Sequence, residues 1–205
     1  DAATCPEDNL YRIVGLFDSE VTLIKSTSYG NYVWNSEWDN TWSSSDIRNT
    51  LNITYYNNIE TQWQNKITNH LWKVGGMRFN KLYTAKDYYD LEVGNSSSII
   101  TDTMKIGLMY LSDYGFATAN NNWTTVLNNT NISNNNWLYL SLNEWTISPQ
   151  LSTTNFAFYV NSSGQINMNW AVDSSYTVRP VFYLNSDVQY ASGSGTESDP
   201  IRIVV

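Results

Sequence analysis

The segment FAFYVNSSGQINMNW, residues 156–170, contains two runs of apolar and aromatic residues on either side of Asn-Ser-Ser-Gly. Runs of this kind, separated by turn residues, predict a β-hairpin. In the second run, the amides of Gln165, Asn167 and Asn169 alternate with apolar side chains. Because successive side chains of a strand point to opposite faces, we expect one face to pack on a core and the other to display amides to water.

The sequence on either side of this hairpin predicts further strands. Residues 143–149 and 176–184 are rich in aromatic and β-branched residues, and turn residues separate the runs at the spacing typical of an antiparallel sheet. The tail, residues 193–205, adds a turn and a last short strand. Near the start of the chain, residues 11–17 and 21–28 have the same character and flank a polar break, so they predict a second hairpin.

The clearest helical pattern lies in residues 59–71, where large side chains recur at intervals of three or four. Gly75 and Gly76 follow this segment and would end the helix. The residues expected on its apolar face are Ile59, Trp63, Ile67 and either His70 or Leu71.

Two further segments carry signals for the start of a helix. Ser43 and Asp46 have the spacing of a capping box, which predicts a short helix over residues 44–52. A threonine and an aspartate at the same spacing open residues 84–93, so we expect a third helix there.

The middle of the chain combines a strand, a turn and a long loop. Residues 103–111 are apolar enough for a buried strand, and residues 112–115 have the composition of a turn. Residues 118–136 are rich in asparagine and predict a surface excursion. Strands, helices and strands follow one another without a linker, so we expect one α+β domain over residues 1–205, with an antiparallel sheet and two or three helices in the N-terminal half.

Composition limits the classes of function. The net charge is −8 and only 15% of the residues are charged, while 41% are hydrophobic. Nucleic-acid binding needs clustered Lys and Arg, which the sequence lacks. No apolar stretch is long enough to span a membrane. The low charge and abundant Asn, Ser, Thr, Trp and Tyr favour an extracellular, cell-surface protein.

Two features bear on what the chain is attached to. The single cysteine, Cys5, cannot form a disulfide within the chain. Because the sequence begins abruptly at Asp1, we expect that an export or anchor segment has been removed. A membrane would then be reached only through a segment that this chain does not contain.

Several motifs in the last third are shared with known proteins. W-T-x-[ST]-P at residues 145–149 and V-R-P-V-x-Y-L at residues 178–184 resemble a group of uncharacterised surface proteins of gut Firmicutes, many of which begin with a type IV prepilin-like anchor. The segments KIGLMYLSDYGFAT at 105–118 and GSGTESDP at 193–200 extend the resemblance.

The same region is more distantly similar to the C-terminal part of formylglycine-generating-enzyme-like and variable-protein C-type-lectin folds. This resemblance implies a C-type-lectin-like fold in which Thr177-Val178-Arg179 occupies the last strand. Formylglycine-generating enzymes depend on active-site cysteines or a copper thiolate site, and Cys5 alone cannot reproduce either. The enzymatic branch of the resemblance is therefore not carried over.

The sequence offers little for catalysis or for a metal. It has no G-x-S-x-G motif for a nucleophilic serine. Its only histidine, His70, cannot supply the four ligands that a zinc site needs. We expect His70 at a helix end. Calcium binding through Asp39, Asn40 or residues 113–122 stays an open alternative because oxygen ligands are common. Arg179, on an apolar strand, is interpreted as a structural residue that bonds carbonyls or a carboxylate.

We therefore expect a non-catalytic surface-display or adhesion domain, without cofactor, that binds a glycan or a surface protein. It would form the head of a pilus-like or anchored surface protein. Amides donate and accept hydrogen bonds without charge, and aromatic rings beside them supply contact area. The expected face combines residues 118–137 and 165–170. Its candidate ligand-binding residues are Asn120, Asn121, Asn122, Trp123, Asn134, Asn135, Asn136, Gln165, Asn167, Asn169 and Trp170.

Two other functions compete with this hypothesis. The first is a structural, pilin-like subunit of an extracellular filament that binds copies of itself, for which exposed Trp34, Trp38 and Trp42 would be the marker. The second is a glycosidase, which would need two carboxylates facing each other across a cleft.

Overall fold

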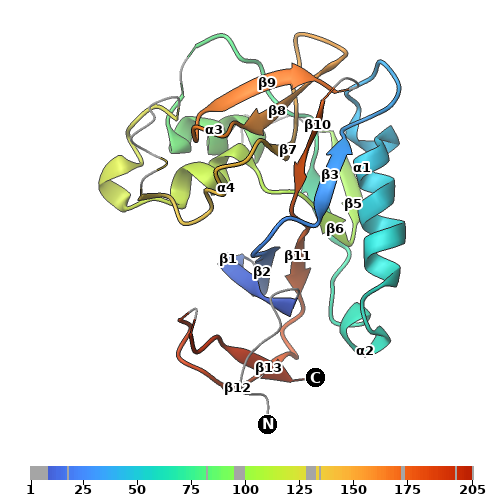
Figure 1. Ribbon diagram of the computed structural model, residues 1–205, viewed down its shortest axis with the longest axis vertical. Helices are drawn as coiled ribbons and strands as arrows, with labels where there is room; N and C mark the ends of the chain where they lie inside the picture. Colours follow the sequence, from blue (N-terminus) through green and yellow to red (C-terminus); the bar gives the residue numbers. More distant parts are fainter. Residues whose placement is uncertain are drawn as a thin grey trace.

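The run of residues 176–184 is divided between two sheets. The computed structural model describes residues 9–17, 19–81, 83–94, 100–127, 133, 135–171, 174–196 and 198–204, and in it the run forms β10 (Ser175–Val178) and β11 (Val181–Leu184). Arg179 and Pro180 separate the two strands, and proline cannot donate a backbone N–H to a ladder. One stretch of chain thus joins the two halves of the molecule (Figure 1).

Strand β11 lies inside an antiparallel four-stranded sheet with the order β1-β2-β11-β6. The predicted N-terminal hairpin is confirmed: it supplies β1 (Tyr11–Phe17) and β2 (Glu20–Lys25), while β6 (Ile106–Gly107) comes from the middle of the chain. Because β2 pairs with β11, a strand from the first part of the chain lies beside one from the last part (Figure 1).

Strand β10 belongs to a five-stranded sheet with the order β3-β10-β7-β8-β9. The hairpin predicted for residues 156–170 is confirmed as β8 (Phe156–Val160) and β9 (Ile166–Trp170), and β9 is an edge strand. All pairs are antiparallel except that of β10 with β7, which is parallel. The remaining strands are β3 (Gly30–Val33) and β7 (Glu144–Pro149).

Two short antiparallel ribbons complete the strands. One joins β4 (His70–Lys73) to β5 (Thr101–Met104), and the other joins β12 (Gln189–Ser192) to β13 (Arg202–Val204) (Figure 1). The predicted final strand is therefore confirmed. Together with the helices, these elements form a single mixed α+β domain, as expected.

The first predicted helix is confirmed, but its cap is Ser45 and not Ser43. The Ser45 hydroxyl accepts a hydrogen bond from the backbone nitrogen of Arg48 at 3.1 Å. A short turn, η2 (Trp42–Ser44), precedes the helix α1 (Asp46–Asn49), which widens into the π-helical segment η3 (Thr50–Tyr55).

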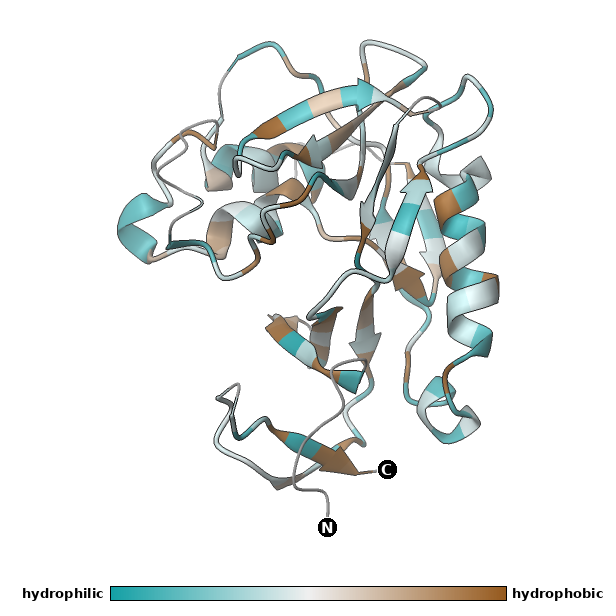
Figure 2. Ribbon diagram, viewed as in Figure 1, coloured by the Kyte–Doolittle hydropathy of each residue, from teal (hydrophilic) through white to brown (hydrophobic). Residues whose placement is uncertain are grey.

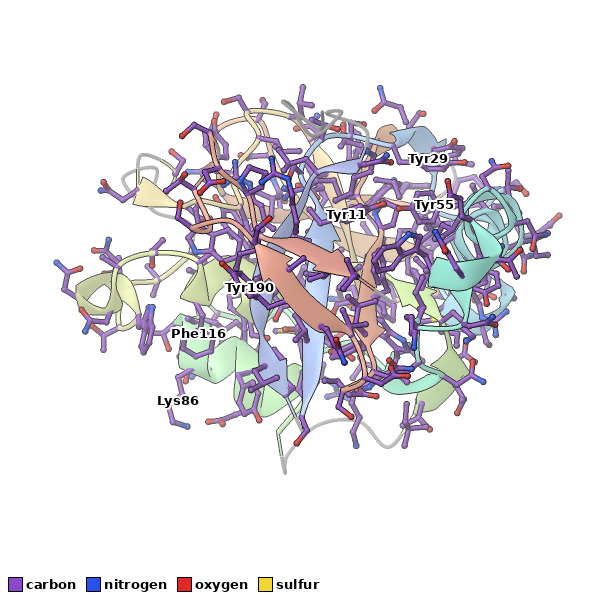
Figure 3. All side chains as sticks on the ribbon, turned by 90° about the horizontal axis from the view of Figure 1, so that it is seen from below. Tyr11, Tyr29, Tyr55, Lys86, Phe116 and Tyr190 are labelled. Carbon is purple, nitrogen blue, oxygen red and sulfur yellow. The ribbon has the colours of Figure 1, made fainter. Side chains whose placement is uncertain are left out.

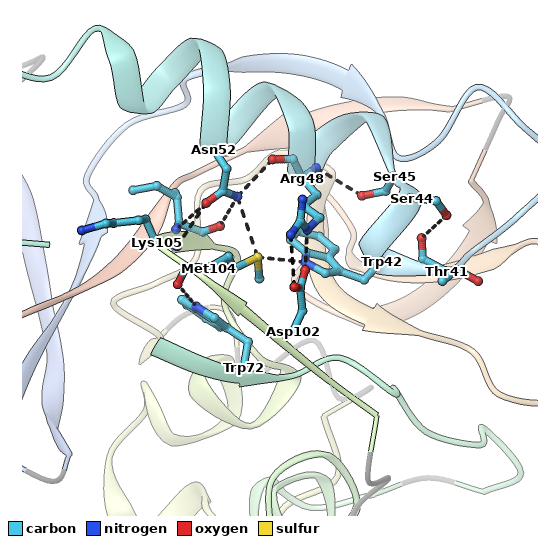
Figure 4. A network of polar contacts seen from close by, with 11 residues as sticks. Thr41, Trp42, Ser44, Ser45, Arg48, Asn52, Trp72, Asp102, Met104 and Lys105 are labelled. Atoms are coloured by element: carbon cyan, nitrogen blue, oxygen red, sulfur yellow. Dashed lines mark hydrogen bonds and ion pairs between the residues drawn. The ribbon is translucent and has the colours of Figure 1, made fainter. Parts of the chain in front are cut away.

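A polar network attaches this helix to β5 (Figure 4). The Arg48 guanidinium group forms a two-point ion pair with Asp102, and the Asn52 side chain bonds the backbone of Lys105 and Ile106. The Trp42 indole nitrogen donates to the sulfur of Met104 at 3.2 Å. These contacts fix the start of the helix, which follows directly on the tryptophan-rich loop.

The helix predicted for residues 59–71 is wrong over most of its length. Only α2 (Thr61–Gln64) is helical, and His70 and Leu71 lie on strand β4. Ile67 forms an isolated bridge with Leu184, so the chain has already turned toward the first sheet. Pairing of β4 with β5 and burial of Trp72 outweigh the helical spacing of the local sequence.

His70 consequently does not end a helix. Its ring stacks on Tyr183 with a centroid distance of 3.7 Å, and its Nδ1 lies 3.1 Å from the Glu20 carboxylate. It therefore links strand β4 to β11 and β2 in the first sheet.

The two remaining helices give opposite outcomes. Helix α3 (Ala85–Glu92) is confirmed with its capping box between Thr84 and Asp87. The turn predicted for residues 112–115 is wrong, because α4 (Leu111–Phe116) occupies that position. Asp113 accepts a hydrogen bond from the backbone nitrogen of Tyr110 at 2.8 Å, which stabilises the first turn of α4.

Aromatic side chains dominate the interior. Trp34, Trp42, Trp72 and Trp145 are fully buried. Trp34 and Trp42 therefore do not provide the exposed surface that was the marker for a filament subunit. Tyrosines also link β1 and the residue before β3 to the helical segment η3: Tyr11 and Tyr55 share a hydrogen bond of 2.7 Å between their hydroxyls, and Tyr29 packs edge-on against Tyr55 (Figure 3).

Arg179 is structural, as predicted. Its side chain is fully buried and forms a two-point ion pair with Glu144, with distances of 2.6 and 2.8 Å. The same guanidinium group donates to the carbonyl of Leu138 at 2.6 Å.

Two buried carboxylates sit at the start of α4. Glu92 accepts hydrogen bonds from the backbone nitrogens of Leu111 and Ser112 and from the Ser148 hydroxyl. Burial raises the pKa of Glu92 to about 7, although these hydrogen bonds lower it. Burial likewise raises the pKa of Asp113 to about 6.

These shifts predict a pH-dependent stability. An unfolded chain releases the same protons near the ordinary carboxyl pKa of about 4, so between about pH 4 and 7 the folded state holds more protons. The free energy of unfolding should therefore fall as the pH rises through this window and should not depend on these groups above it. Urea unfolding at several pH values should show that the free energy of unfolding falls less steeply with pH in Glu92→Gln than in the unchanged protein. An identical slope in the two proteins would contradict the raised pKa of Glu92.

Candidate functional site

Three aromatic rings meet at the end of strand β9, and two of them, Trp38 and Trp170, are exposed to solvent, while Phe156 is half-buried. The ring of Trp170 lies 4.8 Å from that of Trp38 and 5.6 Å from that of Phe156, measured between centroids. Trp38 is 57% exposed and Trp170 is 38% exposed. We call these three residues the aromatic surface. Its members come from two hairpin strands and from the loop that follows β3.

Hydrogen bonds hold the loop that carries Trp38. The Asn35 side chain donates to the carbonyl of Asp39 at 2.9 Å and accepts from the backbone nitrogen of Glu37 at 3.1 Å. At the entry to the loop, the backbone nitrogen of Ser36 donates to the Asp46 carboxylate at 2.6 Å. Side-chain hydrogen bonds to the backbone thus hold the loop in one conformation, and Trp38 lies on this ordered backbone.

Asp39 closes the far side of this loop. Its carboxylate accepts hydrogen bonds from the backbone and hydroxyl of Thr41 and from the Ser44 hydroxyl. Although burial raises it, these hydrogen bonds hold the pKa of Asp39 below its usual range. The carboxylate therefore stays ionised near neutral pH.

Asn40 joins the Trp38 loop to the loop before β8. Its amide nitrogen donates toward the carbonyls of Gln150, Thr153 and Phe156, at 3.0, 3.1 and 2.7 Å. Its backbone nitrogen donates to the carbonyl of Thr154 at 2.7 Å. One buried side chain thereby fixes the position of Trp38 relative to Phe156.

The loop is also attached to the end of β9. The backbone nitrogens of Trp34 and Asn35 both donate to the carbonyl of Ala171, which follows Trp170. All three rings therefore stand on segments that are tied to one another through the backbone.

The side-chain amides of β9 accept hydrogen bonds from backbone N–H groups at the free edge of the same strand. The backbone nitrogens of Met168 and Trp170 donate to the side-chain oxygens of Asn167 and Asn169, each at 2.8 Å. An edge strand would otherwise offer these N–H groups to another chain. Figure 2 shows the hydrophilic residues that alternate with less polar ones along β9.

Asn167 and Asn169 differ in exposure. Asn167 is exposed, whereas Asn169 is half-buried and its amide nitrogen donates to Ser174 at 2.8 Å and to the Tyr176 hydroxyl at 2.6 Å. Both point to the face opposite Trp170 because side chains alternate along the strand. Gln165 lies just before β9, where its oxygen is 3.4 Å from the amide nitrogen of Asn161.

The candidate residues from the asparagine-rich excursion lie elsewhere. The turn η4 (Asn120–Asn122) projects at the opposite side of the molecule from the Trp170 end of β9 (Figure 1). Trp123, 40% exposed, packs edge-on against Phe116 and donates to the carbonyl of Thr118. The expected continuous face is therefore divided, and only Trp170 belongs to the aromatic surface.

The three asparagines at 134–136 have different environments. Asn136 is buried; it donates to the carbonyl of Tyr114 at 2.6 Å and accepts from the backbone nitrogen of Leu138 at 2.9 Å. Asn135 is exposed. Asn134 lies outside the described residues, as does Cys5.

Enclosed space near the aromatic surface is small. A cavity of about 130 Å³ lies between the Trp38 loop and the loop before β8, with Asn40, Val74 and Pro149 in its lining. Pockets for small molecules are usually about 300–1,000 Å³. A ligand of the aromatic surface would therefore bind on the outside of the molecule.

The described residues contain no cluster of three or more His, Cys, Asp or Glu side chains that could hold a metal ion. Within the same ranges, no helix combines the length and apolar character needed to cross a bilayer. No protein-family model, no curated protein and no solved structure matches the chain.

Sequence reasoning missed the partners of Trp170. Trp38 was grouped with Trp34 and Trp42 because all three occur in one loop, although only Trp38 is exposed. Its neighbours, Glu37 and Asp39, are charged, whereas Trp42 precedes a helix cap. That difference in local polarity is the signal that could have separated an exposed ring from buried ones.

The edge caps on β9 yield a prediction. Replacing both Asn167 and Asn169 with valine removes the two acceptors and leaves an apolar, β-branched edge with unpaired N–H groups. We expect the double variant to form dimers and larger species in size-exclusion chromatography with light scattering. Asn121→Val, which changes an exposed asparagine away from any strand, is the control and should not alter the mass. A monomeric double variant that remains folded would refute the capping role.

Proposed function

We propose that this chain is a non-catalytic extracellular binding domain that is displayed at a cell surface and binds a glycan or protein ligand through the aromatic surface. The observation that carries the proposal is the exposure of Trp38 and Trp170 on a backbone that several hydrogen bonds hold in place. Large exposed apolar groups on a rigid frame are characteristic of binding sites.

The free-energy balance supports binding at this position. Full burial of a large apolar side chain contributes about 1.5–3 kcal/mol. Trp38 forgoes much of this contribution in the free protein and can recover it when a ligand covers the ring. Because the loop is already ordered, little conformational entropy is lost on binding.

We also propose a fold type for the domain and its display on an anchor. We regard the arrangement as a variant of the C-type-lectin-like fold, on the grounds of the more distant similarity of the last third of the chain, in which Thr177-Val178-Arg179 stands in the place of the last strand. The pairing of β2 with β11 is compatible with this interpretation, since it places one of the first strands beside one of the last, and Figure 1 shows these two strands apart from β9, which carries part of the aromatic surface. Such a geometry suits display on an anchor.

The proposal predicts which tryptophans matter. Trp38→Ala and Trp170→Ala should each weaken binding about tenfold or more, because each removes a ring at the centre of the contact. Binding is measured on an array of immobilised glycans and on purified host surface glycoproteins. Trp123→Ala and Trp137→Ala are matched controls, since these rings are 40% and 39% exposed at other places. Equal losses for all four variants, or no ligand on either type of surface, would refute the proposal.

Self-assembly is the second candidate function, and the surface of β1 favours it. Leu16 is 70% exposed on this edge strand, and Ile13 and Phe17 are also exposed. Figure 2 shows hydrophobic residues on β1. Unprotected apolar edge strands can pair between chains.

Assembly through β1 would be sensitive to charge. If the protein forms filaments, Leu16→Glu should abolish them in electron micrographs, because a carboxylate would be buried between copies. Leu142→Glu, at an exposed leucine outside β1, is the control and should leave the filaments intact. A protein that stays monomeric at high concentration would remove this candidate.

A further inference from the structure

We infer that the aromatic surface selects uncharged glycans and disfavours anionic ones. This inference rests on the proposed function and names the ligand class of the same site. It follows from the charges around the three rings and from the way in which the rings meet.

The segments that build the site contain no basic residue. Lys25 and Arg48 bracket a stretch, residues 26–47, without Lys or Arg, and this stretch carries Trp38. Residues 106–178, which carry Phe156 and Trp170, likewise contain none. Arg48 itself is engaged in its ion pair with Asp102. A carboxylate, sulfate or phosphate on a ligand would therefore find no cation on these segments.

Acidic groups, in contrast, surround Trp38. Glu37 is its exposed neighbour, Asp39 follows it, and the Asp46 carboxylate accepts a hydrogen bond from the backbone of Ser36 in the same loop. The two aspartates accept hydrogen bonds from backbone N–H groups and hydroxyls, which do not cancel the negative charge. Their field is felt over a distance of about 8–10 Å at moderate ionic strength.

The carboxylate of Glu37 can favour a neutral sugar. Hydroxyl groups donate to carboxylates in charge-assisted hydrogen bonds, which are about twice as strong as neutral ones. Glu37 is exposed and precedes Trp38 in the same loop, so we expect its carboxylate to accept hydrogen bonds from hydroxyls of a sugar ring that covers the indole. A sialic or uronic acid would instead bring a second carboxylate next to Glu37.

The ring geometry favours a sugar over a cationic peptide. An aromatic cage for an ammonium group needs separate rings that face a common space. Trp38 and Trp170 instead touch edge-to-face, at 4.8 Å and 77°. The pair therefore offers a flat, exposed indole backed by a second ring, which matches the flat face of a pyranose.

The test compares neutral oligosaccharides with their charged counterparts on the intact chain. The probes are lactose with 3′-sialyllactose, N-acetyllactosamine with its sialylated form, cellohexaose with an oligogalacturonate, and an oligolysine peptide. We expect at least one neutral probe to bind about fivefold or more tightly than its anionic counterpart at low salt. The ratio should shrink at about 0.5 M salt, where charges are screened within about 4 Å.

Two variants separate the charge effect from the stacking effect. Glu37→Gln should reduce the neutral-to-anionic ratio from both sides, because it weakens the hydrogen bonds to the neutral probe and removes the repulsion of the anionic one. Trp38→Ala should weaken the binding of every probe about tenfold or more, and Trp137→Ala should bind like the unchanged protein. The Gln variant keeps the size of the side chain and lies on the surface, so its fold should be unaffected.

Each other outcome overturns a defined part of the argument. Equal or tighter binding of anionic probes, or of oligolysine, that is lost in Trp38→Ala refutes the selectivity and leaves the binding function intact. Binding of a surface glycoprotein through Trp38 after its glycans are removed has the same meaning. Failure of every probe and every glycoprotein to bind refutes the proposed function together with the inference.

Discussion

Arg179 leaves strand β10 with its side chain turned into the core, where the guanidinium group meets the carboxylate of Glu144. The residue stands between the strands of the two sheets, and Glu144 begins β7 in the second. Loss of one partner from a buried pair costs about 3–5 kcal/mol, against a typical total stability of about 5–15 kcal/mol. The contact with the carbonyl of Leu138 extends this constraint to the segment before β7. Everything carried by β8 and β9, including Phe156 and Trp170, depends on that junction.

Local signals predicted the elements that local interactions stabilise. The hairpins at both ends and helix α3 contain their own turn residues or capping box, so a single sequence suffices to find them. The helix prediction for residues 59–71 was wrong because contacts with distant parts of the chain decide the structure of this segment. Strand β4 pairs with β5, and Ile67 meets Leu184, more than a hundred positions along the chain. The division of β10 from β11 was missed for the same reason, since it follows from which sheet each half joins.

The candidate site shows a similar limit. Strand alternation could place Trp170 and the amides of β9 on opposite faces, and that part of the pattern was available from the sequence. Nothing in the local pattern could show that Asn40 binds three carbonyls of another loop and thereby brings Trp38 to Trp170. The tertiary fold likewise decides that the asparagine-rich segment lies away from this surface.

The abundance of asparagine now has a physical explanation that does not require a ligand. In a chain with few charges, amides can perform the structural work that ion pairs perform elsewhere, because each amide both donates and accepts. Asn40, Asn52 and Asn136 are each bonded to backbone groups of distant segments, and Asn167 and Asn169 protect a sheet edge. Amides committed to such bonds are poorly available to a ligand. The argument for binding therefore passes from the amides to the exposed indoles, which the same amides hold in position.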